Sequence, residues 1–225
     1  MIYNYSDFTT QLLAAGFSMG SGGNDGIYAA VPWNWNEEPP YDTPVRWHTG
    51  DPETDPWEWR MRVLEERDDI AYAKVFFQKS GFITLEWAPC FLAARRPGDL
   101  SFTQAYADGT VSHAAKRIYE VVRQQHVLPM PAIKAMAGFG REDKAQFDRA
   151  LTELQMRMFI TMCGQQQQHA WPSTVFCTTE QFWGDEVLAQ AAAMDPDDAV
   201  QAIAAQVRKL NPNAQEKKIT KFIMG

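Results

Sequence analysis

The order of patterns in residues 111–178 constrains the fold more than any other feature of the chain. Apolar residues recur at the spacing of one helix face over 111–122 and, after a proline-interrupted short helix, over 147–158. Two β-prone runs follow, 158–163 and 174–178, on either side of a glutamine-rich loop. Helix, short helix, longer helix and ribbon is the order of a winged-helix module, whose third helix enters the major groove of DNA. Five apolar residues are expected to pack together: Ile118, Val122, Phe147, Leu151 and Leu154.

The first hundred residues carry weaker patterns. Residues 7–15 predict a short helix and 27–31 a strand. Asp55 followed by Pro56 is typical of a helix start, and this helix is expected to run through Arg67. Two further β-prone runs predict a hairpin over 71–77 and 82–85, although the second run could also open a helix toward Arg96.

Two helices are expected at the end of the chain. Asp195 before Pro196 predicts the start of the first, and Asn213 with Glu216 resembles the capping box of the second. The fold class is therefore α+β and helix-rich. We expect an acidic, Trp-rich α/β region at 1–100 packed on the rest, the winged-helix module at 101–180 and a C-terminal helical pair at 181–225.

Charge is distributed unevenly. Residues 1–58 hold nine acids and one base, a net charge of 1 − 9 = −8, so the rest of the chain carries +1 of the total of −7. Phosphate binding depends on Lys and Arg, so any surface that binds nucleic acid is expected in the C-terminal part of the chain. The alternative interpretation is that the acidic surface of the N-terminal part only aids solubility. The expected DNA contacts are Lys116, Arg117, Arg123, Lys134, Arg141, Lys144, Arg149, Gln166 and Gln168.

Several functional classes lack their sequence signals. No apolar run is long enough to span a membrane, and the N-terminus does not read as a secretory signal. Three widely spaced cysteines indicate free thiols and a cytoplasmic protein. No cofactor motif or zinc-ligand spacing is present, and the G-x-S-x-G match at 16–20 follows a helix rather than a strand. A tryptophan cluster at 33–59 stabilises an irregular region or serves as a stacking platform.

Short motifs resemble a known family. They are Gly81-Phe82-Ile83-Thr84-Leu85-Glu86-Trp87, Ala137-Gly138-Phe139-Gly140, Leu151-Thr152-Glu153-Leu154-Gln155-Met156, Asp55-Pro56-Trp57-Glu58-Trp59-Arg60 and Phe182-Trp183-Gly184. Over about residues 55–225 the chain resembles the AlkZ-related proteins, relatives of the AlkZ/YcaQ-type winged-helix DNA glycosylases that excise alkylated or crosslinked bases. Those enzymes carry a Gln-apolar-Asp or Gln-apolar-Gln triplet. At the corresponding position this chain has Thr84-Leu85-Glu86, so an acid is kept and the glutamine is replaced.

The resemblance implies two alternative functions. In the first, the protein binds double-stranded or damaged DNA and hydrolyses an N-glycosidic bond, with Glu86 activating the water and Thr84 orienting it. In the second, it is a catalytically inert winged-helix module that binds a protein or a small ligand. A DNA-binding protein without catalysis lies between the two. Glu86 also has a purely structural interpretation, in the first turn of a helix, where a carboxylate contributes roughly 0.3–1 kcal/mol.

Overall fold

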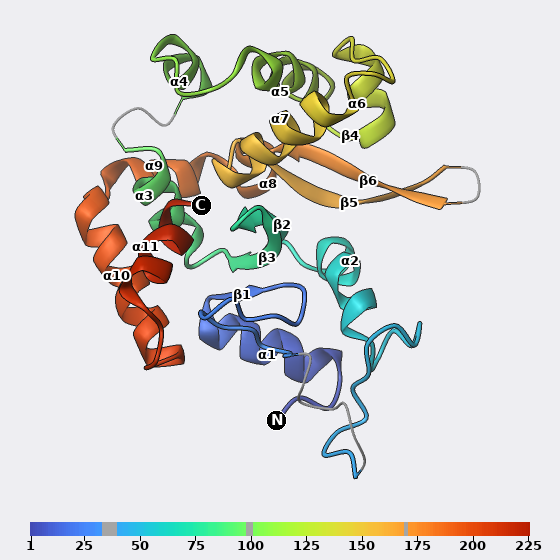
Figure 1. Ribbon diagram of the computed structural model, residues 1–225, viewed down its shortest axis with the longest axis vertical. Coiled ribbons are helices and arrows are strands. Elements are labelled where there is room, and N and C mark those ends of the chain that lie inside the picture. The colour runs from blue at the N-terminus through green and yellow to red at the C-terminus, as the bar shows by residue number, and fades with distance from the viewer. Residues whose placement is uncertain (33–39, 98–100, 169–170) are drawn as a thin grey trace.

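The computed structural model describes residues 1–32, 40–97, 101–168 and 171–225, and these form an α+β fold, as predicted (Figure 1). One six-stranded sheet has the order β1-β3-β2-β5-β6-β4, and its neighbours pair antiparallel. Its strands are β1 (Phe17–Met19), β2 (Ile70–Phe76), β3 (Lys79–Thr84), β4 (Leu128–Pro129), β5 (Ile160–Gln168) and β6 (Trp171–Thr178). The helices are α1 (Tyr5–Ala15), α2 (Pro56–Glu66), α3 (Ala88–Arg95), α4 (Phe102–Ala107), α5 (His113–Gln125), α6 (Met130–Met136), α7 (Lys144–Met156), α8 (Thr179–Trp183), α9 (Asp185–Ala193), α10 (Pro196–Leu210) and α11 (Glu216–Met224).

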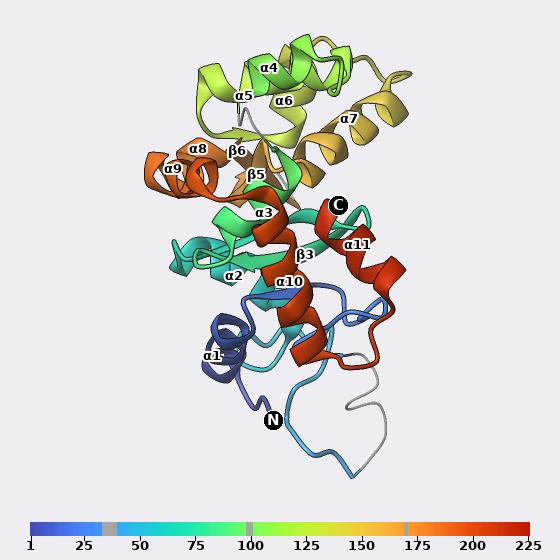
Figure 2. The same cartoon turned by 90° about the vertical axis from the view of Figure 1, so that its left-hand side faces the viewer.

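Both faces of the sheet are covered, which explains why the strands show little polar alternation. On β2, Ile70 and Tyr72 belong to a core shared with α1, α2 and α5–α7. Ala71, Ala73 and Val75 point to the opposite face, into a core shared with α3 and α9–α11. Figure 2 shows α10 and α11 facing the viewer, below the helices α4–α7 that form the upper end of the molecule. None of the helices in the described ranges is long and apolar enough to cross a membrane.

Two of the three expected helix caps are confirmed. The Asp55 side chain accepts from the backbone N–H of Trp57, and α2 begins at Pro56. Asp195 does the same at the start of α10. The capping box expected before the last helix is wrong: the N-cap of α11 is Gln215, without a side-chain cap. Asn211 instead accepts from the Asn213 N–H, and the Glu216 carboxylate pairs with Arg208 at 2.8 Å.

The predicted order of elements in residues 111–178 is confirmed. Helices α5, α6 and α7 are followed by the β5–β6 ribbon, and the five apolar residues expected to meet are buried in one core. The prediction of a glutamine-rich loop is wrong, because β5 continues to Gln168 and pairs with β6, for example at Gln165 with Thr174. His169 lies outside the described residues. A short strand that was not expected, β4, pairs with β6 through Leu128 and Phe176.

The N-terminal predictions are confirmed for α1 and for the β2–β3 hairpin. The strand expected at 27–31 is wrong. One backbone bond, from the N–H of Met19 to the carbonyl of Tyr28, joins this segment to β1, and the next contact uses the Ser18 hydroxyl, which accepts from the Ala30 N–H. Ser18 is buried and its hydroxyl is engaged, so the G-x-S-x-G match is structural.

The described residues include only part of the tryptophan cluster. Trp33 and Trp35 fall outside the described residues, whereas Trp59 is buried and stacks on Phe8 with ring centroids 5.0 Å apart. The division of the chain at residues 100 and 180 stays a prediction.

Candidate functional site

The segment that carries the Thr84-Leu85-Glu86 triplet is a tight turn between β3 and α3. The Trp87 N–H donates to the Thr84 carbonyl at 3.0 Å, and the Leu85 N–H donates to the Asp69 carbonyl at 2.8 Å. The turn exposes Leu85 and Glu86. Helix α3 starts only at Ala88, so Glu86 lies before the helix and not in its first turn.

A pocket of about 460 Å³ opens beside this turn, and both predicted catalytic residues line it. Thr84 is 1% exposed, and its Oγ1 has no hydrogen-bond partner. Within the described residues, the Glu86 carboxylate makes neither a hydrogen bond nor an ion pair. A second acid, Asp69, is held by the guanidinium of Arg67 through two bonds of 2.7 and 2.6 Å. The lining consists of Leu13, Asp69, Thr84, Leu85, Glu86, Trp183, Glu186, Val187 and Gln190.

This arrangement can hold a small polar molecule. An orphaned hydroxyl and a free carboxylate, two residues apart on one turn, offer a donor and acceptors to a water molecule. The sequence did not point to Asp69, which lies immediately before β2, or to Glu186, which lies on α9. No local sequence pattern connects these two segments to the Thr84-Leu85-Glu86 triplet.

Three of the predicted DNA-contacting cations already have partners within the protein. Arg117 is engaged inside the fold: its guanidinium donates to the carbonyls of Ala137 and Gly138 and lies over the Phe139 ring at 4.2 Å. Two of the lysines are paired with acids one helical turn away, Lys116 with Glu120 and Lys144 with Asp148.

The remaining predicted contacts are more accessible. Arg123, Arg141, Arg149 and Gln166 are exposed, and Lys134 is partly exposed on α6. Gln168 is the last residue of β5. Arg123 faces a pocket beside α4, whereas Arg149 lines a separate pocket together with Arg157.

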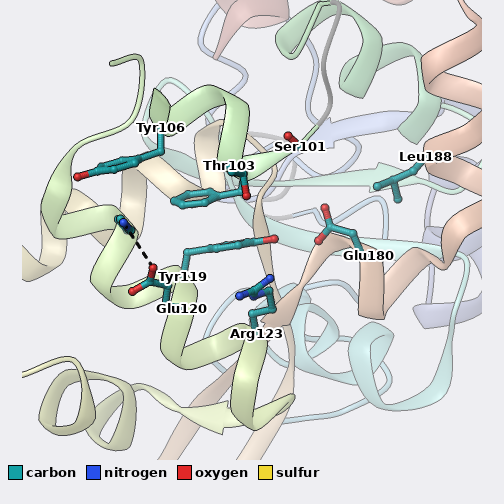
Figure 3. Close-up of a pocket in the computed structure, with 10 residues that line it drawn as sticks. Ser101, Thr103, Tyr106, Tyr119, Glu120, Arg123, Glu180 and Leu188 are labelled. Atoms are coloured by element: carbon teal, nitrogen blue, oxygen red, sulfur yellow. Dashed lines mark ion pairs between the residues drawn. The ribbon is translucent and has the colours of Figure 1, made fainter. Parts of the chain in front are cut away.

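The pocket beside Arg123 has a volume of about 480 Å³ and lies between α4, α5, α8 and α9 (Figure 3). Helix α5 contributes Lys116, Tyr119, Glu120 and Arg123, whose spacing places them on one helix face. Figure 3 shows Tyr119 and Arg123 pointing toward Glu180 of α8.

Tyr119 is a residue of this pocket whose pKa is shifted. Burial, and then the charge of Glu180, raises the pKa of Tyr119 to about 12, so its hydroxyl keeps its proton. Sequence reasoning counted Tyr119 as core and missed Tyr106 and Glu180, because the short helices α4 and α8 that carry them have no clear apolar period. Within the described residues, no group of three or more His, Cys, Asp or Glu side chains is placed to hold a metal ion.

Comparison with known proteins gives one family and one solved structure. The family model described as AlkZ related matches residues 2–224. Among solved structures, the Streptomyces sahachiroi DNA glycosylase AlkZ aligns with a TM-score of 0.41 and 15% sequence identity, over 75% of this chain and 50% of that chain. The aligned part therefore spans half the length of that glycosylase. No curated protein matches the chain.

Proposed function

Because the chain belongs to the AlkZ-related family, we propose that it acts on DNA as a relative of the AlkZ DNA glycosylases. The partner in this proposal is double-stranded or damaged DNA, and residues 101–180 act as a winged-helix module. The pairing of β4 with β6 supports this, since a short strand between the first two helices that joins the ribbon is part of winged-helix topology. A cytoplasmic location is part of the same proposal, with three free thiols in its support.

The observation that carries a catalytic role is the pocket shared by Thr84 and Glu86. In the proposed reaction the Glu86 carboxylate takes a proton from a water molecule, whose oxygen attacks C1′ of the nucleotide. The N-glycosidic bond breaks, the base leaves with its electron pair and takes up the proton that Glu86 removed from the water, and the hydroxyl stays on the sugar. The Thr84 hydroxyl, buried without a partner, orients the water.

For DNA binding, we assign the phosphate contacts first to the exposed cations Arg123, Arg141 and Arg149, to the partly exposed Lys134, and to the ribbon residues Gln166 and Gln168. Lys116 and Lys144 contribute less because each is paired with an acid. Arg117 contributes indirectly, by holding the turn between α6 and α7.

Binding of a fluorescent DNA duplex over a salt series tests the proposal. Affinity should fall linearly with salt on a log–log plot, because bound cations release counterions from the phosphates. Charge reversal of Arg123 and Arg141 together should weaken binding and flatten the slope. The control is Lys209→Glu, an exposed cation on α10, which should change neither. An absence of salt-dependent binding near ~50 mM salt would contradict the proposal.

A specific observation favours the alternative of an inert module. The pocket beside Glu86 is lined by three acids, Asp69, Glu86 and Glu186, and by no Lys or Arg within the described residues. Such a surface repels a phosphate backbone. If duplexes carrying alkylated bases are bound but never lose a base, the protein is a binding module.

A further inference from the structure

The pocket between α4, α5, α8 and α9 is separate from the Thr84–Glu86 pocket and has no part in the proposed hydrolysis. We propose that it binds a single nucleotide, with Arg123 on the phosphate and Glu180 on a base N–H. This deepens the proposed function in one respect, because an unpaired nucleotide of a DNA strand is one of two sources of this ligand. A free nucleotide is the other.

The pocket keeps one acceptor that the protein does not use. Glu180 Oε1 lies 3.6 Å from Nη1 of the buried Arg96, so the carboxylate has a positive charge beside it. Glu180 Oε2 is buried and has no hydrogen-bond partner. A buried carboxylate oxygen without a donor is costly, and a ligand N–H would satisfy it.

A cation for an anionic group lies on the opposite wall. Arg123 is exposed and makes no ion pair within the described residues, whereas its neighbour on the same face, Lys116, is neutralised by Glu120 at 3.7 Å. Glu180 is balanced by Arg96. The pocket therefore presents one unneutralised guanidinium, which suits a phosphate.

Between these two groups the wall suits a planar ring with polar edges. The Tyr119 hydroxyl, protonated at neutral pH, lies beside Glu180 and can donate to a ring nitrogen or carbonyl. Phe102 and Tyr119 stack with centroids 3.8 Å apart and make this wall rigid. The volume of about 480 Å³ lies in the range of small-molecule sites and accommodates a mononucleotide. A donor, an acceptor and a cation that line one pocket match the polar edge of a base and its 5′-phosphate.

Calorimetric titration with 2′-deoxyadenosine 5′-monophosphate tests the pocket directly. We expect it to bind about tenfold or more tightly than 2-deoxyribose 5-phosphate, which lacks the base. Arg123→Ala should weaken both ligands, while Lys209→Ala, which removes a cation far from the pocket, should change neither. Glu180→Gln should weaken the nucleotide and leave the sugar phosphate unchanged.

A change in the ligand tests the same contact without altering the protein. The N6,N6-dimethyl nucleotide has no N–H donor and should bind no better than the sugar phosphate. Equal affinity for nucleotide and sugar phosphate, or an Arg123→Ala protein that binds like Lys209→Ala, would overturn the proposal.

A DNA arm separates the two sources of the ligand. A duplex with one bulged adenosine should bind more tightly than the fully paired duplex, and Arg123→Ala should remove this gain. Nucleotide binding without the gain identifies the free nucleotide as the ligand. Nucleotide binding without any duplex binding leaves the pocket assignment standing and contradicts the DNA function. Duplex binding without nucleotide binding or a bulge effect contradicts the pocket assignment alone.

Discussion

The guanidinium of Arg95 donates a hydrogen bond from Nε to the backbone carbonyl of Ile223, at 2.7 Å and across 128 residues of sequence. The same side chain donates to the carbonyls of Phe222, Val75 and Met156. Burial lowers the pKa of Arg95 to about 9, so it is charged at neutral pH. One buried cation thus joins α3 to the last turn of α11, to β2 and to the end of α7.

Replacing Arg95 with Met should destabilise the fold by roughly 2–4 kcal/mol, because several buried carbonyls would lose their donor. Arg95→Lys keeps the charge but cannot reach all four acceptors, so its loss should be smaller. Urea unfolding followed by circular dichroism measures both. A change below about 0.5 kcal/mol for Arg95→Met would show that these carbonyls find other donors.

A second long-range contact supplies a side-chain acceptor to a backbone N–H of β2. The Gln155 side-chain carbonyl accepts from the Lys74 N–H at 3.0 Å, and its amide donates to the Leu151 carbonyl. Gln155 is 1% exposed and its bond with the Lys74 N–H is part-buried, so Gln155→Leu should cost about 1 kcal/mol by leaving that N–H without its acceptor. Gln155→Glu keeps an oxygen that can accept from the Lys74 N–H. Comparing its free energy of unfolding with that of Gln155→Leu, in the same urea experiment, isolates the contribution of this acceptor.

These two contacts mark the limit of sequence prediction in this chain. The starts of α2 and α10 were predictable because Asp55 and Asp195 act on residues two positions away. The helices at 111–158 were predictable from one apolar face each. The strand expected at 27–31 failed because the segment does not continue a backbone ladder beside β1: after the bond from Met19 to Tyr28, the Ala30 N–H donates to the Ser18 hydroxyl and not to a backbone carbonyl.

The candidate sites also contain residues that were predictable from the sequence and residues that were not. Thr84 and Glu86 were predictable together because they belong to one turn. Their pocket also needs Trp183 and Glu186, about a hundred residues away in sequence, and the second pocket needs Glu180 opposite Arg123. Such pairs arise from helix packing, and no spacing in the chain reports them.

Glu86→Gln should lower base excision by about a hundredfold, if the protein hydrolyses a glycosidic bond, because the amide cannot accept the proton of water. Its free energy of unfolding should change by less than ~0.5 kcal/mol, since Glu86 is exposed. Release of alkylated bases from a labelled duplex measures the rate. Glu65→Gln, an exposed acid on α2, is the matched control, and equal rates for the two variants would remove Glu86 from the mechanism.

Cys163 of the β5–β6 ribbon should be more reactive than Cys90. A hydrogen bond from Cys177 lowers the pKa of Cys163, while burial raises the pKa of Cys90. At pH 8 iodoacetamide should therefore modify Cys163 first, because the thiolate is the reactive form. Cys177→Ala removes the hydrogen bond and should slow modification of Cys163. Peptide mass spectrometry over a time course distinguishes the sites, and faster labelling of Cys90 would contradict the assignment.

Alkaline pH should weaken the fold through Tyr119. Its pKa is raised from 10.0 to about 12, so the folded state holds this proton more tightly than the unfolded state. The resulting stabilisation is complete below pH 10 and is lost as the pH rises toward 12. Tyr119→Phe should show a shallower loss of stability over that window. Denaturant midpoints at several pH values measure it, and identical profiles for both proteins would exclude this contribution.

The β5–β6 ribbon has a consequence for how copies of the chain meet. β5 contacts β2 through Tyr72 and Met162, and β6 contacts β4 only at Val175 and Phe176. In the described part of the ribbon beyond Gly164, each strand pairs only with the other, which leaves two outer edges of unsatisfied backbone groups. Such edges template the addition of further strands, and glutamine-rich segments do so readily. Pro172 has no backbone N–H, so β6 offers one donor fewer to a strand that would add along its outer edge.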